Sequence, residues 1–187
     1  MTNLKSWFDK GMNKYEYIAN MKVHKENLLK VYNNFQLTEE DKQILQALQE
    51  KEIKAVVITA DWCGDAMVNL PILMRMSEEA LLETRYLIRD ENLELMDQYL
   101  TNGTARSIPI IVFVNKEFEE VGKWGPRSPE AQRFADDLRA SLPPKDSEEY
   151  EVAFKENFIK QFLERITTDE TLWTEIKTDL LSVLKEV

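Results

Sequence analysis

The stretch of sequence that most constrains the fold is "IKAVVITA", residues 53–60, which is β-branched and almost wholly apolar. A run that is apolar on both faces is typical of a central strand buried between two layers. A helical pattern follows from Cys63 to about Ala80, and Pro71 inside it removes one backbone donor, which predicts a kink. We therefore expect an α/β fold in which helices cover both faces of a sheet.

The segments after this helix alternate between strand and helix patterns. Ser128 and Pro129 mark the start of the last one, because serine caps a helix and proline suits its first position. The pattern predicts a strand, a helix, a strand, the second arm of a hairpin and a helix, over residues 84–89, 91–100, 109–115, 117–125 and 129–141. Together with the first strand, these segments predict a mixed sheet of four strands.

Both ends of the chain have helical patterns that extend beyond this core. Residues 1–51 form the predicted N-terminal extension, in which Thr38 is a natural N-cap and Asp41 can answer it in a weaker form of the capping box. The C-terminal extension, residues 142–187, opens with the linker "LPPKDS" and continues as two amphipathic helices. Apolar residues recur in them every four positions, at Phe154, Phe158, Phe162 and Ile166 and at Leu172, Ile176, Leu180 and Leu184. We expect both extensions to pack against a core of residues 52–141.

Charge and composition exclude several classes of function. The 187-residue chain carries 34 acidic and 24 basic residues, and the net charge of −10 opposes association with nucleic acids and anionic membranes. One cysteine cannot form an internal disulfide, and the polar N-terminus resembles no signal peptide or membrane span, so we expect a cytoplasmic protein. With one histidine and one cysteine, the sequence has no metal-ligand spacing, and we expect no metal and no cofactor.

Four sequence features together identify a family. The predicted strand ends in "ADWCGD", a proline lies eight residues after the cysteine, and a later "SIPIIVF" leads into a hairpin with "VGKWG". In this order they resemble the thioredoxin family, over residues 53 to about 140. Within it, the chain is most similar to thioredoxin-like proteins whose active site reads Trp-Cys-Gly-Asp-Cys, except that Ala66 stands in place of the second cysteine. The fold implied is thioredoxin-like, with extra N- and C-terminal helices.

The resemblance also implies a set of site residues. Cys63 takes the place of the nucleophilic cysteine, and Ala66 that of the resolving one. Substrate contacts are implied for the residues around Cys63 and for a cis Ile-Pro pair that presents its backbone to an extended substrate: Asp61, Trp62, Gly64, Asp65, Ile108 and Pro109. Thioredoxin carries a buried aspartate six residues before its first cysteine, and Val57 occupies that position here.

Position at a helix N-terminus determines the expected reactivity of Cys63. Unpaired N–H groups and the positive end of the helix dipole stabilise a thiolate there and lower its pKa. The carboxylate of Asp65 in the same turn opposes this effect, so we expect a moderate lowering.

The missing second thiol leaves three functional interpretations open. The chain is a thiol-disulfide oxidoreductase whose resolving cysteine is replaced by Ala66, a natural monothiol enzyme that uses a low-molecular-weight thiol, or a redox-inactive interaction module of thioredoxin fold. We favour the first, because every other feature of the motif fits a dithiol site. The expected partners are protein or low-molecular-weight disulfides and thiols, and the expected oligomeric state is a monomer or weak dimer.

Overall fold

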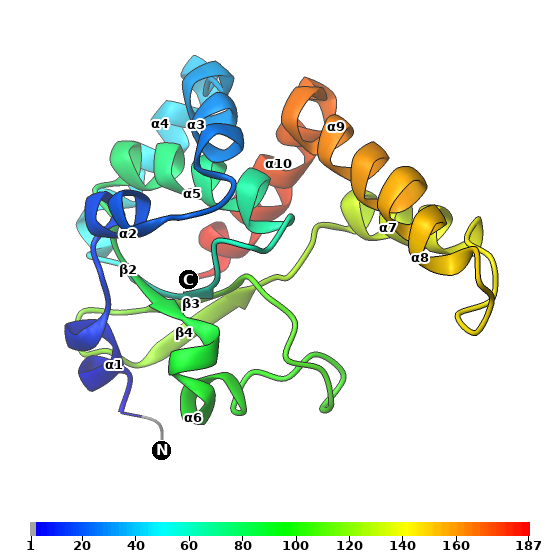
Figure 1. The fold of residues 1–187 in the computed structure, drawn as a ribbon. Helices are drawn as coiled ribbons and strands as arrows, with labels where there is room; N and C mark the ends of the chain where they lie inside the picture. Colours follow the sequence, from blue (N-terminus) through cyan, green and yellow to red (C-terminus); the bar gives the residue numbers. More distant parts are fainter. Residues whose placement is uncertain (1–2) are drawn as a thin grey trace.

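A four-stranded mixed sheet lies at the centre of the computed structural model, which describes residues 3–187 (Figure 1). Its strands are β1 (Lys54–Thr59), β2 (Glu83–Ile88), β3 (Ile110–Val114) and β4 (Glu120–Trp124), in the order β2-β1-β3-β4. Strand β1 is parallel to β2 and antiparallel to β3, and β4 is antiparallel to β3. After its first residue β1 is buried throughout, as its apolar sequence predicts. The predicted mixed sheet is confirmed.

Helix α5 (Ala66–Ala80) connects β1 to β2 and is almost entirely buried, with Pro71 in its interior. It begins three residues later than the sequence pattern predicts. The segment before it forms tight turns, in which the N–H of Cys63 donates to the carbonyl of Ala60 at 3.2 Å and that of Met67 to Gly64 at 3.1 Å. Cys63 therefore lies in the connecting turn and is not a helical residue.

The N-terminal extension consists of α1 (Leu4–Lys10), α2 (Lys14–Asn20), α3 (Lys25–Asn34), α4 (Glu39–Ala47) and the 3₁₀ turn η1 (Gln49–Lys51). Helices α3 and α4 pack on α5, and α1 lies on the opposite side of the sheet (Figure 1). The capping box predicted for α4 is present, because Thr38 accepts from the N–H of Asp41 while Asp41 accepts from that of Thr38. Met12 exchanges both backbone hydrogen bonds with Tyr86, which covers the outer edge of β2.

The C-terminal extension follows α7 (Pro129–Ala140), which starts at the predicted serine cap. It contains α8 (Tyr150–Ala153), the π-helical segment η3 (Phe154–Ile159), α9 (Lys160–Thr168) and α10 (Glu170–Glu186). Helix α10 packs on α5 and β4, where the indole N–H of Trp124 donates to Asp179 at 2.7 Å. Helices α7, α8 and α9 project beside the sheet as an arm (Figure 1).

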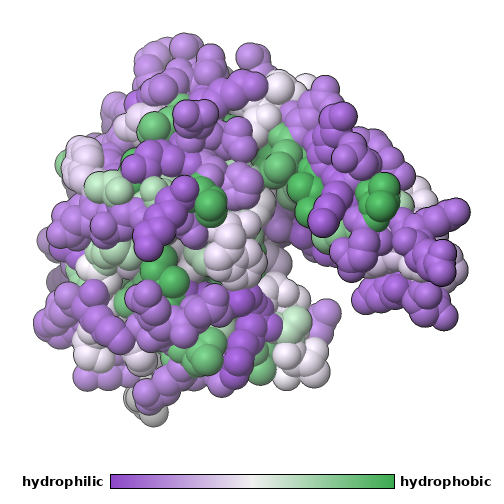
Figure 2. Space-filling view, viewed as in Figure 1, coloured by the Kyte–Doolittle hydropathy of each residue, from purple (hydrophilic) through white to green (hydrophobic). Residues whose placement is uncertain are grey.

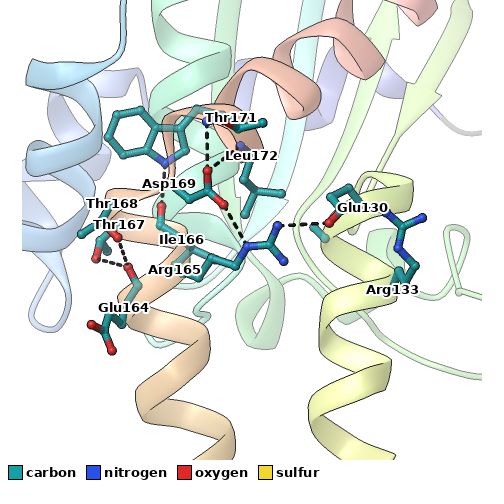
Figure 3. A network of polar contacts seen from close by, with 12 residues as sticks. Glu130, Arg133, Glu164, Arg165, Ile166, Thr167, Thr168, Asp169, Thr171 and Leu172 are labelled. Carbon is teal, nitrogen blue, oxygen red and sulfur yellow. Dashed lines mark hydrogen bonds and ion pairs between the residues drawn. The ribbon is translucent and has the colours of Figure 1, made fainter.

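One arginine connects three helices at the base of this arm (Figure 3). Arg165 in α9 donates to Asp169 at 2.9 Å and to Glu130 of α7 at 3.0 Å. Asp169 is also the N-cap of α10, since its carboxylate accepts from the N–H groups of Thr171 and Leu172. The arm is thereby fixed relative to α10, and buried residues of both extensions join the core in one continuous cluster.

Two predicted elements differ from the observed ones. The helix expected over residues 91–100 is reduced to η2 (Arg89–Glu91) and α6 (Leu93–Met96). After α6 the chain turns, and the hydroxyl of Tyr99 donates to Glu120 of β4. The hairpin arm expected from residue 117 begins at Glu120, since Asn115 accepts backbone N–H groups inside the turn. Among residues 3–187, every helix is too short or too polar to cross a lipid bilayer.

Candidate functional site

Cys63 lies where β1 ends, beside the start of β3. The antiparallel pairing of β1 with β3 sets Ile110 opposite Ile58, which brings the residues just before β3 close to the turn that holds the cysteine. The thiol donates to the carbonyl of Ile108 at 3.3 Å. The Ile108-Pro109 peptide bond is cis, as the resemblance implied. Strand register therefore positions the thiol against the backbone that precedes the cis-proline.

The electrostatics of this thiol differ from the sequence-based expectation. Cys63 is only 7% exposed, and burial, reinforced by the negative charge of Asp65, raises its pKa to about 11. The N–H groups of Ala66 and Asp65 and the charge of Arg127 act in the opposite direction but are weaker. The expected lowering of the pKa is wrong, because desolvation penalises a thiolate more than the start of the helix stabilises it.

Asp65 is buried beside the cysteine and paired with an arginine. Arg127 donates to its carboxylate at 2.7 Å, and the two side chains are 13% and 11% exposed. Burial raises the pKa of Asp65, although the ion pair with Arg127 lowers it in part. The resemblance implied a substrate contact for Asp65, but in this structure its carboxylate faces Arg127.

The turn before Arg127 holds it in place. The Gly125-Pro126 peptide bond is also cis, and the side-chain amide of Asn69 in α5 donates to the carbonyl of Pro126 at 2.9 Å. Gly125 has φ +119°, and a methyl group there would lie 2.2 Å from the carbonyl oxygen of Pro109. This close approach requires glycine at residue 125. It places the turn before Arg127 against the cis-proline beside Cys63.

The C-terminal arm borders the site on the side of Gly64. A methyl group on Gly64 would lie 3.5 Å from the ring of Phe162 and 3.7 Å from Leu163, and the guanidinium of Arg127 lies 5.6 Å from the Phe162 centroid. Stacked rings continue from Phe162 outward along the arm, through Phe158, Phe154 and Tyr150. In Figure 2, apolar side chains gather where the arm meets the body, above a hollow between the two. The sequence pattern did not predict that the C-terminal arm borders the site, although the phenylalanine repeat marks the face of the arm that does so.

Asp61 and Trp62 lie on the other side of the cysteine. The carboxylate of Asp61 accepts from the backbone N–H groups of Lys22 at 2.7 Å and Val23 at 3.3 Å, so it holds the connection between α2 and α3. Trp62 is 49% exposed, and the guanidinium of Arg89 lies 4.6 Å from its ring centroid. Trp62 thus forms an exposed rim next to the buried thiol.

The position of a resolving cysteine contains no reactive group. Ala66 is the buried first residue of α5, and Val57, where thioredoxin has an aspartate, is buried in β1. Within residues 3–187, no three side chains of the histidine, cysteine, aspartate or glutamate types converge as a metal site would require. The site therefore offers one thiol, one buried ion pair and a backbone surface.

Comparisons with known proteins bear on the family and the fold. The sequence model of the family described as Thioredoxin matches residues 11–139. A protein of unknown function from Pseudomonas aeruginosa has a similar structure, with a TM-score of 0.70 and 15% identity over 99% of this chain and 98% of that one. An HIV epitope-scaffold also has a TM-score of 0.70, with 13% identity over 98% of each chain. Among curated proteins, none matches this chain in sequence. The family match covers more than half of the chain, which therefore belongs to the thioredoxin family.

Proposed function

We propose that this protein is a thioredoxin-like thiol-disulfide oxidoreductase that reduces or exchanges disulfides through Cys63 as a monothiol. The observation that carries the proposal is the position of the sulfur, which lies at the turn into α5 and 3.3 Å from the carbonyl of Ile108, beside a cis-proline. In this proposal the backbone before that proline contacts an extended substrate, as the family resemblance implies. The exposed ring of Trp62 provides an apolar rim for the same substrate.

The proposed reaction is a single exchange at sulfur. The Cys63 thiolate attacks one sulfur of a substrate disulfide, so that a new S–S bond to Cys63 forms and the old S–S bond breaks. Its electron pair leaves on the second substrate sulfur, which takes a proton from water. In a dithiol enzyme the second cysteine then releases the substrate, but Ala66 carries no thiol, so the mixed disulfide persists until an external thiol attacks it.

The raised pKa makes this reaction slow in the free protein at neutral pH. A thiol with a pKa of about 11 is ionised in about one molecule in 1,000 at pH 8. Exchange accelerates with pH, and it accelerates further if bound substrate changes the charge balance between Cys63, Asp65 and Arg127. The substrates we propose are protein or low-molecular-weight disulfides, met in the cytoplasm by a monomer or weak dimer.

A second candidate function is a redox-inactive interaction module of thioredoxin fold. The burial of Cys63 and its raised pKa favour this candidate, because both suppress thiolate chemistry. In this case the thiol is a small buried side chain, and partners bind elsewhere on the surface.

Incubation with a disulfide-bonded peptide, followed by mass spectrometry of the intact protein, separates the two functions. We expect an adduct of one peptide half per chain, formed faster at alkaline pH, stable after removal of excess peptide and absent from Cys63→Ser. A wild-type protein that remains unmodified at about pH 9, while its urea-unfolded form reacts, would leave the interaction module as the better explanation.

A further inference from the structure

A cavity of about 410 Å³ lies next to the cysteine turn, between the N-terminal extension and the ends of β1 and β2. Its volume lies within the range of small-molecule sites, which measure about 300–1,000 Å³. Met12, Met21 and Tyr17 supply apolar surface to its wall. Thioether side chains adapt to ligands of varied shape, so such a wall suits a small flexible molecule.

Hydrogen bonds hold the wall of this cavity in place. The backbone of Met12 pairs with Tyr86 of β2 in both directions, at 2.8 and 2.9 Å. Asp61 accepts from the N–H of Lys22, which fixes the connection between α2 and α3 at the cavity rim. The site is therefore formed before any ligand binds, which reduces the ordering cost of binding.

The charges at the cavity have both signs. Lys22, Asp61 and Glu91 all line it. In the part of the chain that the structure describes, no carboxylate pairs with the ammonium of Lys22 and no cation pairs with Glu91. An unpaired cation and an unpaired anion on one cavity match a ligand that carries both an ammonium and a carboxylate group.

One residue of the cavity wall lies close to the cysteine along the chain. Asp61 is two residues from Cys63, a span of at most about 7 Å along the backbone. The hydroxyl of Tyr17 lies 3.3 Å from Thr59 at the end of β1. Burial, together with the nearby charges of Asp61 and Cys63, raises the pKa of this tyrosine to about 12. The same side chain therefore lines the cavity and lies within electrostatic range of the cysteine.

We propose that this cavity binds a zwitterionic low-molecular-weight thiol of about dipeptide size, with its carboxylate at Lys22 and its ammonium at Glu91 and Asp61. This inference rests on the proposed function, because it assigns to the bound thiol the resolving step that Ala66 cannot perform. Its thiolate attacks the sulfur of Cys63 in the mixed disulfide and forms a new S–S bond. The bond from Cys63 to the substrate breaks, and the electron pair leaves on the substrate sulfur, which takes a proton from water. A second molecule of the thiol then attacks the sulfur of the first. It releases Cys63 as a thiolate and yields the oxidised low-molecular-weight disulfide.

Binding is tested without redox chemistry, with S-methylated cysteinylglycine as the probe and calorimetry or tryptophan fluorescence as the readout. We expect saturable binding to the full chain, weakened at least fivefold by Lys22→Met and by Glu91→Gln. The matched controls are Lys30→Met and Glu26→Gln, which remove exposed charges of α3 away from the cavity and should leave affinity unchanged. No saturable binding at millimolar probe, or equal effects of cavity and control substitutions, would overturn the site.

Resolution is tested on the pyridyl mixed disulfide of Cys63, formed with dithiodipyridine and followed by release of thiopyridone. At equal thiolate concentration, we expect cysteinylglycine to react faster than mercaptoethanol and with saturation. Lys22→Met should slow mercaptopropionate, and Glu91→Gln should slow cysteamine, each by more than it slows the uncharged mercaptoethanol. Equal, unsaturated rates for all four thiols would refute the cavity's role and leave exchange at Cys63 intact. Failure of Cys63 to form the pyridyl adduct would refute the proposed function and the resolving step, whatever the binding assay shows.

Discussion

Replacing Asp65 with asparagine should lower the pKa of Cys63 and make the thiol more reactive. Burial is the largest cause of the raised pKa, and the charge of Asp65 is the second. Asparagine keeps the shape of the side chain and removes the charge. The substitution also leaves Arg127 without its carboxylate partner, so that its positive charge acts on Cys63 with less compensation. Burial remains, so the pKa should stay above that of a free cysteine.

Coulomb's law gives the approximate size of the effect. Two residues of chain place the charges on the order of 7 Å apart, where they interact by about 2 kcal/mol at an effective dielectric constant of about 20. Asparagine removes this repulsion, which lowers the pKa of Cys63 by about 1.5 units. The thiolate fraction at pH 8 then rises about 30-fold. Because nucleophilicity falls with pKa, the net gain in alkylation rate is about sixfold.

The assay measures the rate of iodoacetamide alkylation between about pH 7 and pH 10, quantified by intact mass. The single cysteine makes every adduct a report on Cys63. Asp97→Asn is the matched control, because it breaks an exposed aspartate-arginine pair and should leave the rate unchanged. Asp65→Asn should also cost about 2–3 kcal/mol of stability, since Arg127 loses its buried partner. An unchanged or lower alkylation rate in a folded Asp65→Asn protein would refute the electrostatic account.

Three further predictions concern stability. Gly125→Ala should destabilise the fold by at least about 2 kcal/mol in urea unfolding, because the new methyl group collides with the carbonyl of Pro109. Gly103→Ala places its methyl group in open space and should cost about 1 kcal/mol. Equal costs for the two substitutions would contradict the collision. Lys177→Met should cost about 3 kcal/mol at pH 7, because it removes the cation that pairs with the buried carboxylate of Asp41 and helps to hold its pKa below the usual range. The cost should disappear at acidic pH, once this carboxylate is protonated in both proteins, and a cost independent of pH would contradict the ion pair. Because the pKa of Cys63 is raised in the folded protein, the thiol ionises first in the unfolded chain, so the free energy of unfolding should fall as pH rises from about 9 towards 11. At pH 10 this loss should be about 1.4 kcal/mol in the wild-type protein and absent from Cys63→Ala. Parallel pH profiles of the two proteins would place the folded pKa near its ordinary value.

Local chemistry was enough to predict most of the fold. The apolar run before the cysteine gave the central strand, and Ser128 with Pro129 gave the start of α7, because burial on two faces and helix capping depend on neighbouring residues. The cis bond at Ile108-Pro109 came from the family resemblance and is confirmed. The π-helical turn in the arm and the shortened helix after β2 depend on distant packing, and no local pattern predicts them.

The candidate site was predictable in position but not in its electrostatics. The spacing of the motif placed Cys63 at the turn before a helix, where a lowered pKa is the usual expectation. The sign of the shift depends on how much protein covers the sulfur, which a sequence does not reveal. Arg127 and Phe162, which border the site, come from 62 and 98 residues further along the sequence than Asp65 and Gly64, and only the folded chain brings them together.

In the proposed function, Cys63 performs thiol-disulfide exchange and stalls because residue 66 lacks sulfur. The most direct measurement compares the wild-type protein with Ala66→Cys in the reduction of insulin by dithiothreitol, together with the mass of each protein after exposure to a peptide disulfide. We predict that the wild-type protein retains the peptide adduct and gives little turnover. The Ala66→Cys protein should lose the adduct as an internal disulfide forms, and it should catalyse insulin reduction, because residues three apart at a helix start lie on one face. An Ala66→Cys protein that folds, forms neither adduct nor internal disulfide, and gives no turnover would contradict the account.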